Sequence, residues 1–98
     1  MFIPCDDAKR LMKEKNAQLV DVRTPEEFAM SKLPGAINIP LQDIDRVGES
    51  ILDKDLPVIV FCRSGQRSHM AMQILLSQSF DEVHNLGSFM AWHQCPDL

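Results

Sequence analysis

One segment organises this chain: Val58-Ile59-Val60-Phe61-Cys62-Arg63-Ser64-Gly65-Gln66-Arg67-Ser68. Its first four residues are apolar and β-branched or aromatic, which predicts a buried strand over 58–61 that ends at Cys62. Five polar or small residues follow. From Ser68 through Ser79 the apolar residues recur at helical spacing, which predicts a helix. A thiol thus stands at the carboxyl end of a strand, where open α/β sheets bind ligands.

The expected surroundings of Cys62 favour its thiolate. A loop that closes over the sulfur can turn backbone N–H groups inward, and the N-terminus of the next helix adds partial positive charge. Arg63 and Arg67 add two full charges nearby. In such surroundings a thiol pKa of about 8.5 falls to roughly 3.5–7.5. Free cysteines are often small buried hydrophobes, but a core cysteine needs no polar loop behind it. We therefore expect Cys62 to be reactive.

Strands and helices alternate along the rest of the chain. The residue patterns predict strands at 19–22, 36–39 and 83–86, and helices at 4–15, 25–30, 41–47 and 87–92. Residues 48–54 are expected to be a polar linker with Ile51 and Leu52 turned inward, and Phe28 is expected to anchor the second helix in the core. The fold class is α/β, with a small, mainly parallel sheet and helices on both faces.

Right-handed crossovers place Cys62, the Asp21 loop and Gly35 along one rim of this sheet. Asp21 and Arg23 follow the first strand, and we expect them to support the site structurally. The carboxylate would accept hydrogen bonds from loop amides, and Arg23 would pair with Glu26 or Glu27, because ion-pair networks are commoner than ligand contacts.

Composition and charge restrict the function classes. The chain has 98 residues, and we expect one domain over 1–98. Its 45% hydrophobic and 24% charged residues are typical of a soluble globular protein. A formal net charge of −4 argues against a general nucleic-acid binder, and no apolar run is long enough for a membrane span. The oligomeric state is left open.

The N-terminus lacks the basic region and apolar core of a signal peptide. We therefore expect a cytoplasmic protein with reduced thiols at Cys5, Cys62 and Cys95. The cysteines and histidines offer no zinc-ligand spacing, since His93 and Cys95 stand two apart without a second pair. No dinucleotide-binding glycine pattern is present. We expect neither a metal nor a cofactor.

The segment after Cys62 resembles the active-site loop of the rhodanese-like sulfurtransferases. Three further segments resemble signatures of that family: Leu-Val-Asp-Val-Arg-Thr-Pro-Glu-Glu-Phe at 19–28, Leu-Pro-Gly-Ala-Ile-Asn-Ile-Pro at 33–40, and Val-His-Asn-Leu-Gly-Ser-Phe-Met-Ala-Trp at 83–92. Four matches in the right order cover nearly the whole chain. The resemblance implies a small α/β domain whose loop cysteine carries sulfur as a persulfide, with Asp21 and Arg23 holding the loops around the site.

Cysteine phosphatases use a similar anion-binding loop. Their signature places an arginine sixth after the cysteine, whereas here Arg67 is fifth and Ser68 is sixth. The arginine that grips phosphate through two hydrogen bonds is then out of place, so sulfur transfer is the favoured reaction. The phosphatase stays as an alternative. Another is a non-catalytic rhodanese-like module that binds a partner protein, although many such modules lack the cysteine that this chain keeps.

The expected enzyme is a sulfurtransferase like the thiosulfate sulfurtransferases. Cys62 attacks the outer sulfur of a small anionic donor such as thiosulfate, and a thiol or a protein acceptor then takes that sulfur from the persulfide. One departure from the family bears on the donor: the two-domain thiosulfate enzymes carry an arginine where Glu27 stands, so we expect Glu27 to weaken thiosulfate binding. The substrate-binding residues are expected to be Arg63, Ser64, Gly65, Gln66, Arg67 and Ser68.

Overall fold

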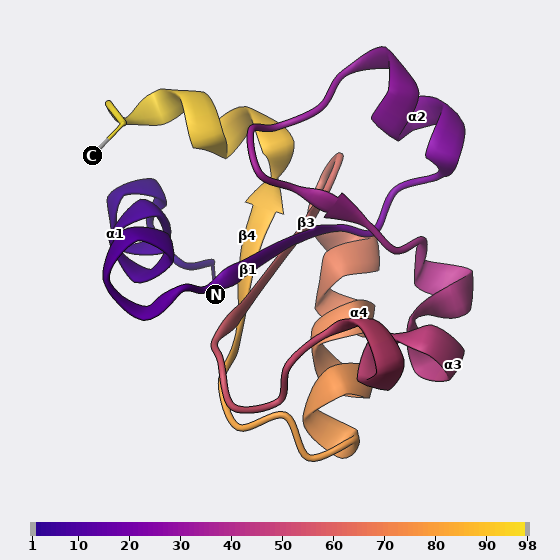
Figure 1. Ribbon diagram of the computed structural model, residues 1–98. Helices are drawn as coiled ribbons and strands as arrows, with labels where there is room; N and C mark the ends of the chain where they lie inside the picture. Colours follow the sequence, from indigo (N-terminus) through magenta and orange to yellow (C-terminus); the bar gives the residue numbers. More distant parts are fainter. Residues whose placement is uncertain (1, 98) are drawn as a thin grey trace.

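The structure is a computed structural model that describes residues 2–97, so the expected domain range 1–98 includes one residue at each end that lies outside the description. A single four-stranded parallel sheet has the strand order β2-β1-β3-β4. Figure 1 shows β1, β3 and β4 of this sheet side by side. Along the chain the elements are α1 (Cys5–Lys15), β1 (Gln18–Asp21), α2 (Pro25–Met30), β2 (Ile37–Asn38), α3 (Leu41–Ile51), β3 (Val58–Cys62), α4 (Gln66–Ser77), β4 (Val83–Ser88) and the 3-10 helix η1 (Phe89–Gln94). The predicted α/β class is confirmed.

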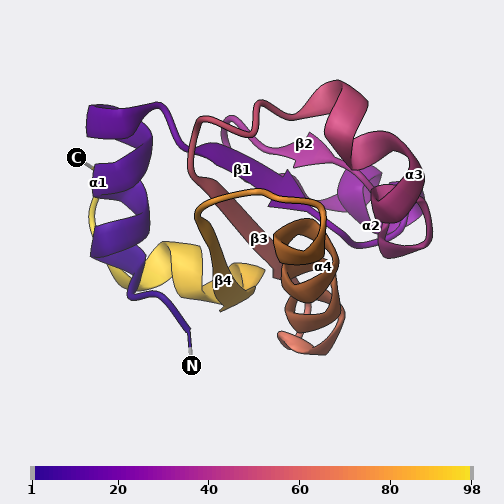
Figure 2. The same ribbon diagram turned by 90° about the horizontal axis from the view of Figure 1, so that it is seen from below.

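β3 lies between β1 and β4, and all five of its residues are buried. Side chains on a strand alternate between the two faces of the sheet. Val58, Val60 and Cys62 therefore join the apolar cluster beneath α3 and α4, whereas Ile59 and Phe61 join the cluster beneath α1 and η1. Figure 2 shows α3 and α4 on one side of the sheet and α1 on the other. The apolar run that predicted a buried strand thus reflects burial on both faces.

α4 begins at Gln66, two residues earlier than predicted, and ends at Ser77 rather than Ser79. The residue before the helix is Gly65, with φ +101°. Glycine adopts this left-handed conformation without the penalty that a Cβ atom brings. The chain can therefore turn from strand to helix within three residues, and Arg67 lies on the first turn of the helix rather than in the loop.

The linker predicted over 48–54 is wrong, because α3 continues through Gly48 to Ile51. Gly48 is buried, and a Cβ atom built there would lie 3.2 Å from Cδ2 of Leu75 on α4. A glycine that looks like a helix breaker in sequence here permits close packing of two helices. Of the two residues expected to point inward, Leu52 is buried and Ile51 is exposed.

Two further expectations are wrong. Phe28 is not a core anchor, since α2 buries no residue and the half-exposed ring lies under the ammonium of Lys32 at 5.3 Å. Gly35 does not share the rim with Cys62. It precedes Ile37, the first residue of β2, and β2 runs parallel to β1. Gly35 therefore lies toward the opposite, amino-terminal rim, near Met12 of α1.

Cys5 and Cys95 form a disulfide across 90 residues and join the start of α1 to the residue after η1. Within residues 2–97, Cys62 is the free cysteine. The expectation of reduced thiols is therefore wrong for Cys5 and Cys95. Lys9 strengthens the same junction, because its Nζ donates a hydrogen bond to the carbonyl of Cys95 at 2.9 Å and lies 4.5 Å from the centre of the Trp92 ring. Sequence spacing alone could not show that packing of α1 against η1 brings the two cysteines together.

Within the described range of residues 2–97, no helix is long and apolar enough to cross a lipid bilayer.

Removal of the disulfide should lower the stability of the fold. We expect Cys5→Ser to reduce the free energy of unfolding by about 2–4 kcal/mol, because the unfolded chain regains the freedom that the cross-link removes. Urea unfolding without reductant measures this loss, and wild type in reductant should approach the variant. Thiol titration of unfolded, unreduced wild type should find one thiol. Three thiols, together with equal stability of the variant, would contradict the disulfide.

Candidate active site

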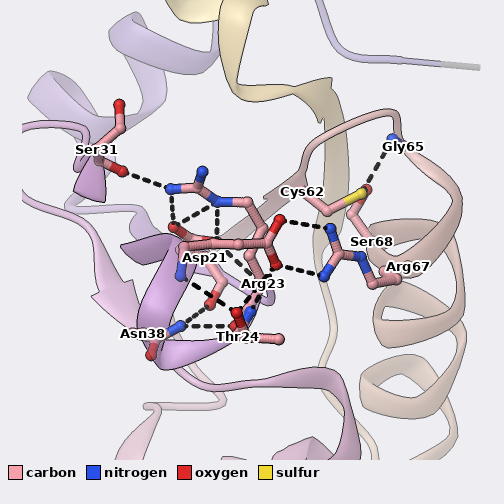
Figure 3. Close-up of polar contacts among 10 residues, drawn as sticks. Asp21, Arg23, Thr24, Ser31, Asn38, Cys62, Gly65, Arg67 and Ser68 are labelled. Atoms are coloured by element: carbon pink, nitrogen blue, oxygen red, sulfur yellow. Dashed lines mark hydrogen bonds and ion pairs between the residues drawn. The ribbon is translucent and has the colours of Figure 1, made fainter. Parts of the chain in front are cut away.

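Asp21 and Arg23 form a buried ion pair at the carboxyl end of β1, with side-chain exposures of 0% and 4%. The carboxylate accepts hydrogen bonds from Nη2 of Arg23 at 2.7 Å, from its Nε at 3.0 Å and from its backbone N–H at 2.9 Å (Figure 3). The expected pairing of Arg23 with Glu26 or Glu27 is therefore wrong. A buried charge requires a partner at close range, and Asp21 is near in sequence and buried with it.

This ion pair holds several segments of the rim together. Nη2 of Arg23 also donates to the carbonyl of Ser31, after α2, and the guanidinium lies 4.6 Å from the centre of the Phe89 ring on η1. The side-chain amide of Asn38, at the end of β2, donates to the carbonyls of Asp21 and Arg23, each at 3.0 Å. The ends of β1 and β2, the end of α2 and the start of η1 are thereby fixed relative to one another.

Cys62 ends β3 at this same rim and is fully buried. Its Sγ accepts a hydrogen bond from the backbone N–H of Gly65 at 3.0 Å and lies 3.5 Å from Oγ of Ser68 (Figure 3). A cysteine that only filled core space would not need two polar partners. The sulfur thus has an apolar cluster on one side and hydrogen-bond donors on the other.

Hydrogen bonds make this sulfur lose its proton more readily. Burial raises the pKa of the Cys62 thiol, but the hydroxyl and N–H of Ser68 and the N–H groups of Gly65 and Ser64 lower it by more, so the pKa lies below its usual value. A thiolate is a nucleophile and a thiol is a poor one. The direction agrees with the sequence-based expectation. The cause of the lowered pKa differs from the expected one. Hydrogen bonds lower it, and the charges of Arg63 and Arg67 are not among the main causes.

The loop is supported from behind at Gly65. A Cβ atom there would lie 2.7 Å from Cζ of Phe2 and 3.3 Å from Cα of Gly87, so the site accepts only glycine without a shift of its neighbours. The Asn85 side chain donates to the carbonyl of Gly65 at 3.3 Å, and its Oδ1 accepts from the N–H of Gly87 at 2.8 Å. These contacts aim the N–H of Gly65 at Sγ of Cys62.

The predicted substrate-binding residues other than Arg67 separate into two groups. Gly65 and Ser68 are buried and face the sulfur, whereas Arg63, Ser64 and Gln66 are exposed. Within residues 2–97, Arg63 forms no ion pair.

Arg67 is half-buried and turns to Glu27 of α2. Its Nη1 donates to Oε1 at 2.8 Å and its Nη2 donates to Oε2 at 3.2 Å. Arg67 is one of the expected substrate-binding residues, and its charge is already paired with an anion.

Some roles in the site were not identified from sequence. Asn38 and Asn85 lie within the quoted signature segments and Phe2 lies outside them, but none of the three was assigned a role, because each acts through a contact with a segment distant in the chain. Glu27 was identified as a departure from the family, but its pairing was not. Thr24 and Glu27 have the spacing of a capping box, which fixes Glu27 on the first turn of α2. Its partner, 40 residues away, cannot be read from that pattern.

Known proteins resemble this chain in sequence and in fold. Residues 5–95 match the rhodanese-like domain family. A protein named sulfurtransferase from Allochromatium vinosum is 38% identical over 86 residues, which cover 87% of this chain and 79% of the relative. The thiosulfate sulfurtransferase GlpE of Vibrio cholerae is 35% identical, with coverage of 96% and 89%. A rhodanese-like domain protein of Staphylococcus aureus matches the structure with TM-score 0.78, 34% identity and coverage of 99% and 93%.

Replacement of Asp21 should destabilise the fold strongly. We expect Asp21→Asn to lower the free energy of unfolding by about 3–5 kcal/mol, because the guanidinium of Arg23 stays buried without its counter-charge. Urea unfolding measures the loss. Asp43→Asn is the matched control, since Asp43 pairs with Arg46 at the exposed surface and such pairs contribute about 0–1 kcal/mol. Equal losses in the two variants would contradict a special role for the buried pair.

Removal of the Ser68 hydroxyl should raise the pKa of Cys62. A hydrogen bond to a charged group contributes about 1.5–3 kcal/mol, so Ser68→Ala should move the pKa up by about one unit or more. The pH dependence of alkylation by iodoacetamide gives this pKa. Ser64→Ala is the control, because Ser64 acts on the sulfur through its backbone N–H and that group remains. An unchanged midpoint in Ser68→Ala, or the same shift in both, would count against the assignment.

Proposed function

The chain belongs to the rhodanese-like sulfurtransferase family, and on that premise we propose that it carries sulfane sulfur on Cys62 from an anionic donor to a thiol acceptor. The observation that carries the proposal is the sulfur of Cys62 at the end of β3, held by the N–H of Gly65 and the hydroxyl of Ser68. These donors stabilise a negative charge at that point.

In the first half-reaction the Cys62 thiolate attacks the outer sulfur of the donor. With thiosulfate, a bond forms between Sγ and the outer sulfur, the sulfur–sulfur bond of the donor breaks, and sulfite leaves with the electron pair. The enzyme retains a persulfide whose terminal sulfur is negatively charged. Backbone N–H groups of the loop and of the first turn of α4 are the donors that stabilise this charge, in the manner of an oxyanion hole.

In the second half-reaction an acceptor thiolate attacks the terminal sulfur. A bond forms between the acceptor and that sulfur, and Cys62 leaves as a thiolate. A thiol of lower pKa is a better leaving group. The hydrogen bonds that lower the pKa of Cys62 therefore assist the release of sulfur as well as its capture. The acceptor in this proposal is a small thiol or a cysteine of another protein.

Access to the sulfur requires a movement of the loop. Cys62 has 0% exposed surface, so a donor cannot contact Sγ in the arrangement described. Arg63 and Ser64, which follow Cys62 in the chain, are exposed. Gly65 is fixed by Phe2 and Asn85. We infer that Arg63 and Ser64 shift when the donor enters, while the N–H of Gly65 stays in place.

The phosphatase alternative is less well supported than sulfur transfer. A phosphate-binding arginine must offer both guanidinium N–H groups to the substrate, and both of these groups in Arg67 already donate to Glu27. The non-catalytic module remains the contrasting hypothesis, and it requires no reaction at Cys62. We further propose that residues 1–98 act as a single domain. The cytoplasmic location stays a prediction, and the Cys5–Cys95 disulfide counts against it, because disulfides are rare in reducing compartments.

Incubation with thiosulfate should add one sulfur atom to Cys62. We expect the intact mass to rise by one sulfur, the added mass to map to the peptide that contains Cys62, and cyanide to remove it as thiocyanate. Cys62→Ser should show no gain, because a hydroxyl is a far poorer nucleophile than a thiolate. Cys5→Ser and Cys95→Ser should still gain sulfur.

The same preparations separate the alternatives. A non-catalytic module would gain no mass with any sulfane donor. Hydrolysis of an aryl phosphate by wild type, faster than persulfide formation, would favour the phosphatase and contradict the proposal.

A further inference from the structure

Arg67 connects the sulfur-binding loop to a small hollow on the surface. The hollow, about 240 Å³ in volume, lies between the end of β1, the starts of α2 and α3, and the first turn of α4. Its lining includes Val22, Pro25, Pro40 and Leu41, which are apolar, and Arg67 is the charged residue among the lining residues. A donor that enters here meets one cation and otherwise mainly apolar surface.

Glu27 neutralises that cation. Its two carboxylate oxygens accept hydrogen bonds from the two terminal nitrogens of Arg67 at 2.8 and 3.2 Å. The pair is only partly exposed, with 35% of the Arg67 side chain and 30% of the Glu27 side chain accessible. Coulomb interactions at such partly buried positions are stronger than in bulk water. The guanidinium therefore has little attraction left for a second anion.

The carboxylate of Glu27 is not free to move aside. The backbone N–H of Thr24 donates to Oε1 of Glu27 at 3.0 Å, and the backbone N–H of Glu27 donates to Oγ1 of Thr24 at 3.2 Å. This reciprocal capping box holds the side chain at the start of α2. The hydrogen bond from Arg67, followed by that from Thr24, lowers the pKa of Glu27 to about 2. The pair therefore stays charged at neutral pH.

We propose that Glu27 determines donor specificity by holding Arg67 as a neutral pair, so that the site takes singly charged organic sulfane donors in preference to inorganic dianions. This inference rests on the proposed function and identifies the substrate class of the same site. A donor of the form R–SO2–S⁻ or R–S–S⁻ carries one negative charge for the N–H groups around Cys62. Its organic group contacts the apolar lining of the hollow.

The reaction balances for such a donor. With an organic thiosulfonate, the Cys62 thiolate forms a bond to the terminal sulfur, and the sulfur–sulfur bond of the donor breaks. The organic sulfinate leaves with the electron pair, and the persulfide keeps one negative charge. No oxidant, reductant or further reactant is needed. The step differs from that with thiosulfate in one respect: the leaving group carries one negative charge rather than two.

Two matched donors test the charge preference. Thiosulfate and methanethiosulfonate have similar shapes, and they differ by a negatively charged oxygen in place of a methyl group. We would measure kcat/KM for each donor at low ionic strength, with cyanide as acceptor. Each value is divided by the rate constant of the same donor with free cysteine, which removes differences in intrinsic reactivity. The ratio of the two normalised values reports the preference of the site.

The variants change one charge at a time. Glu27→Gln keeps the spacing of the capping box, which accepts glutamine, and releases the charge of Arg67. Glu26→Gln is the control, because it removes the same formal charge from the same exposed helix turn. The double variant Glu27→Gln/Arg67→Gln removes the freed cation again. Circular dichroism and urea unfolding establish that each variant is folded.

We expect wild type to favour methanethiosulfonate after normalisation. Glu27→Gln should raise the thiosulfate-to-methanethiosulfonate ratio about tenfold, which corresponds to a charge contact of about 1.4 kcal/mol. Glu26→Gln should change the ratio less than twofold, and the double variant should return toward wild type. A general structural effect of Glu27 would change both donors equally and leave the ratio constant.

The outcomes that overturn the inference are distinct from those that overturn the function. If persulfide forms but Glu27→Gln and Glu26→Gln have the same ratio, Glu27 does not determine specificity. If Glu27→Gln does not fold, the wild-type ratio decides, and a normalised preference for thiosulfate overturns the inference. If neither donor leaves sulfur on Cys62 in any variant, the proposed function is wrong. The role of Glu27 in donor specificity is then wrong as well.

Discussion

The buried ion pair between Asp21 and Arg23 is the interaction on which the rim of this sheet depends. Two opposite charges removed from water stabilise a fold only when their hydrogen bonds are nearly complete. Here the carboxylate accepts from the side chain and the backbone of the same arginine, and the guanidinium also donates to the carbonyl of Ser31 and lies against Phe89. The chain segments that carry these groups can therefore take only one arrangement, and the loop of Cys62 is built beside it.

Hydrogen bonds and charges act on different groups in this site. The sulfur of Cys62 is stabilised by short-range donors from Gly65 and Ser68, whereas Arg67 is occupied by Glu27. Hydrogen bonds from a rigid backbone act on one atom and fade within a few ångströms, whereas a free cation acts on every anion in the vicinity. A site built in the first way selects a sulfur atom at one position and leaves the rest of the donor to be recognised separately.

Strands and helices that depend on local residue patterns were predicted correctly from the sequence. The apolar run of β3 identified the buried strand. The helices predicted over 4–15 and 25–30 match α1 and α2 to within one residue. The position of Cys62 at a strand end followed from the same run. Local pattern failed where a distant contact decided the outcome. Gly48 continues a helix because Leu75 packs against it.

The partners of side chains were the least predictable feature. The sequence predicts that Arg23 pairs with a glutamate of α2, but Arg23 pairs with Asp21. Glu27 of α2 pairs with Arg67 of α4 instead. Charges adjacent in sequence offer several pairings of similar energy, and the packing of the elements selects among them. For the same reason the closure of Cys5 with Cys95 had no sequence signal, because it depends on α1 lying beside η1.

That closure has a mechanical consequence. The disulfide spans 90 residues and encloses every strand of the sheet within one covalent ring. A pulling force applied to the chain outside Cys5 and Cys95 passes through the sulfur–sulfur bond and not through the backbone between them. The sheet carries no tension while the bond is intact. Reduction would transfer the load to the parallel strands, so the redox state of this pair decides whether the domain behaves under force as a rigid link or as an extensible one.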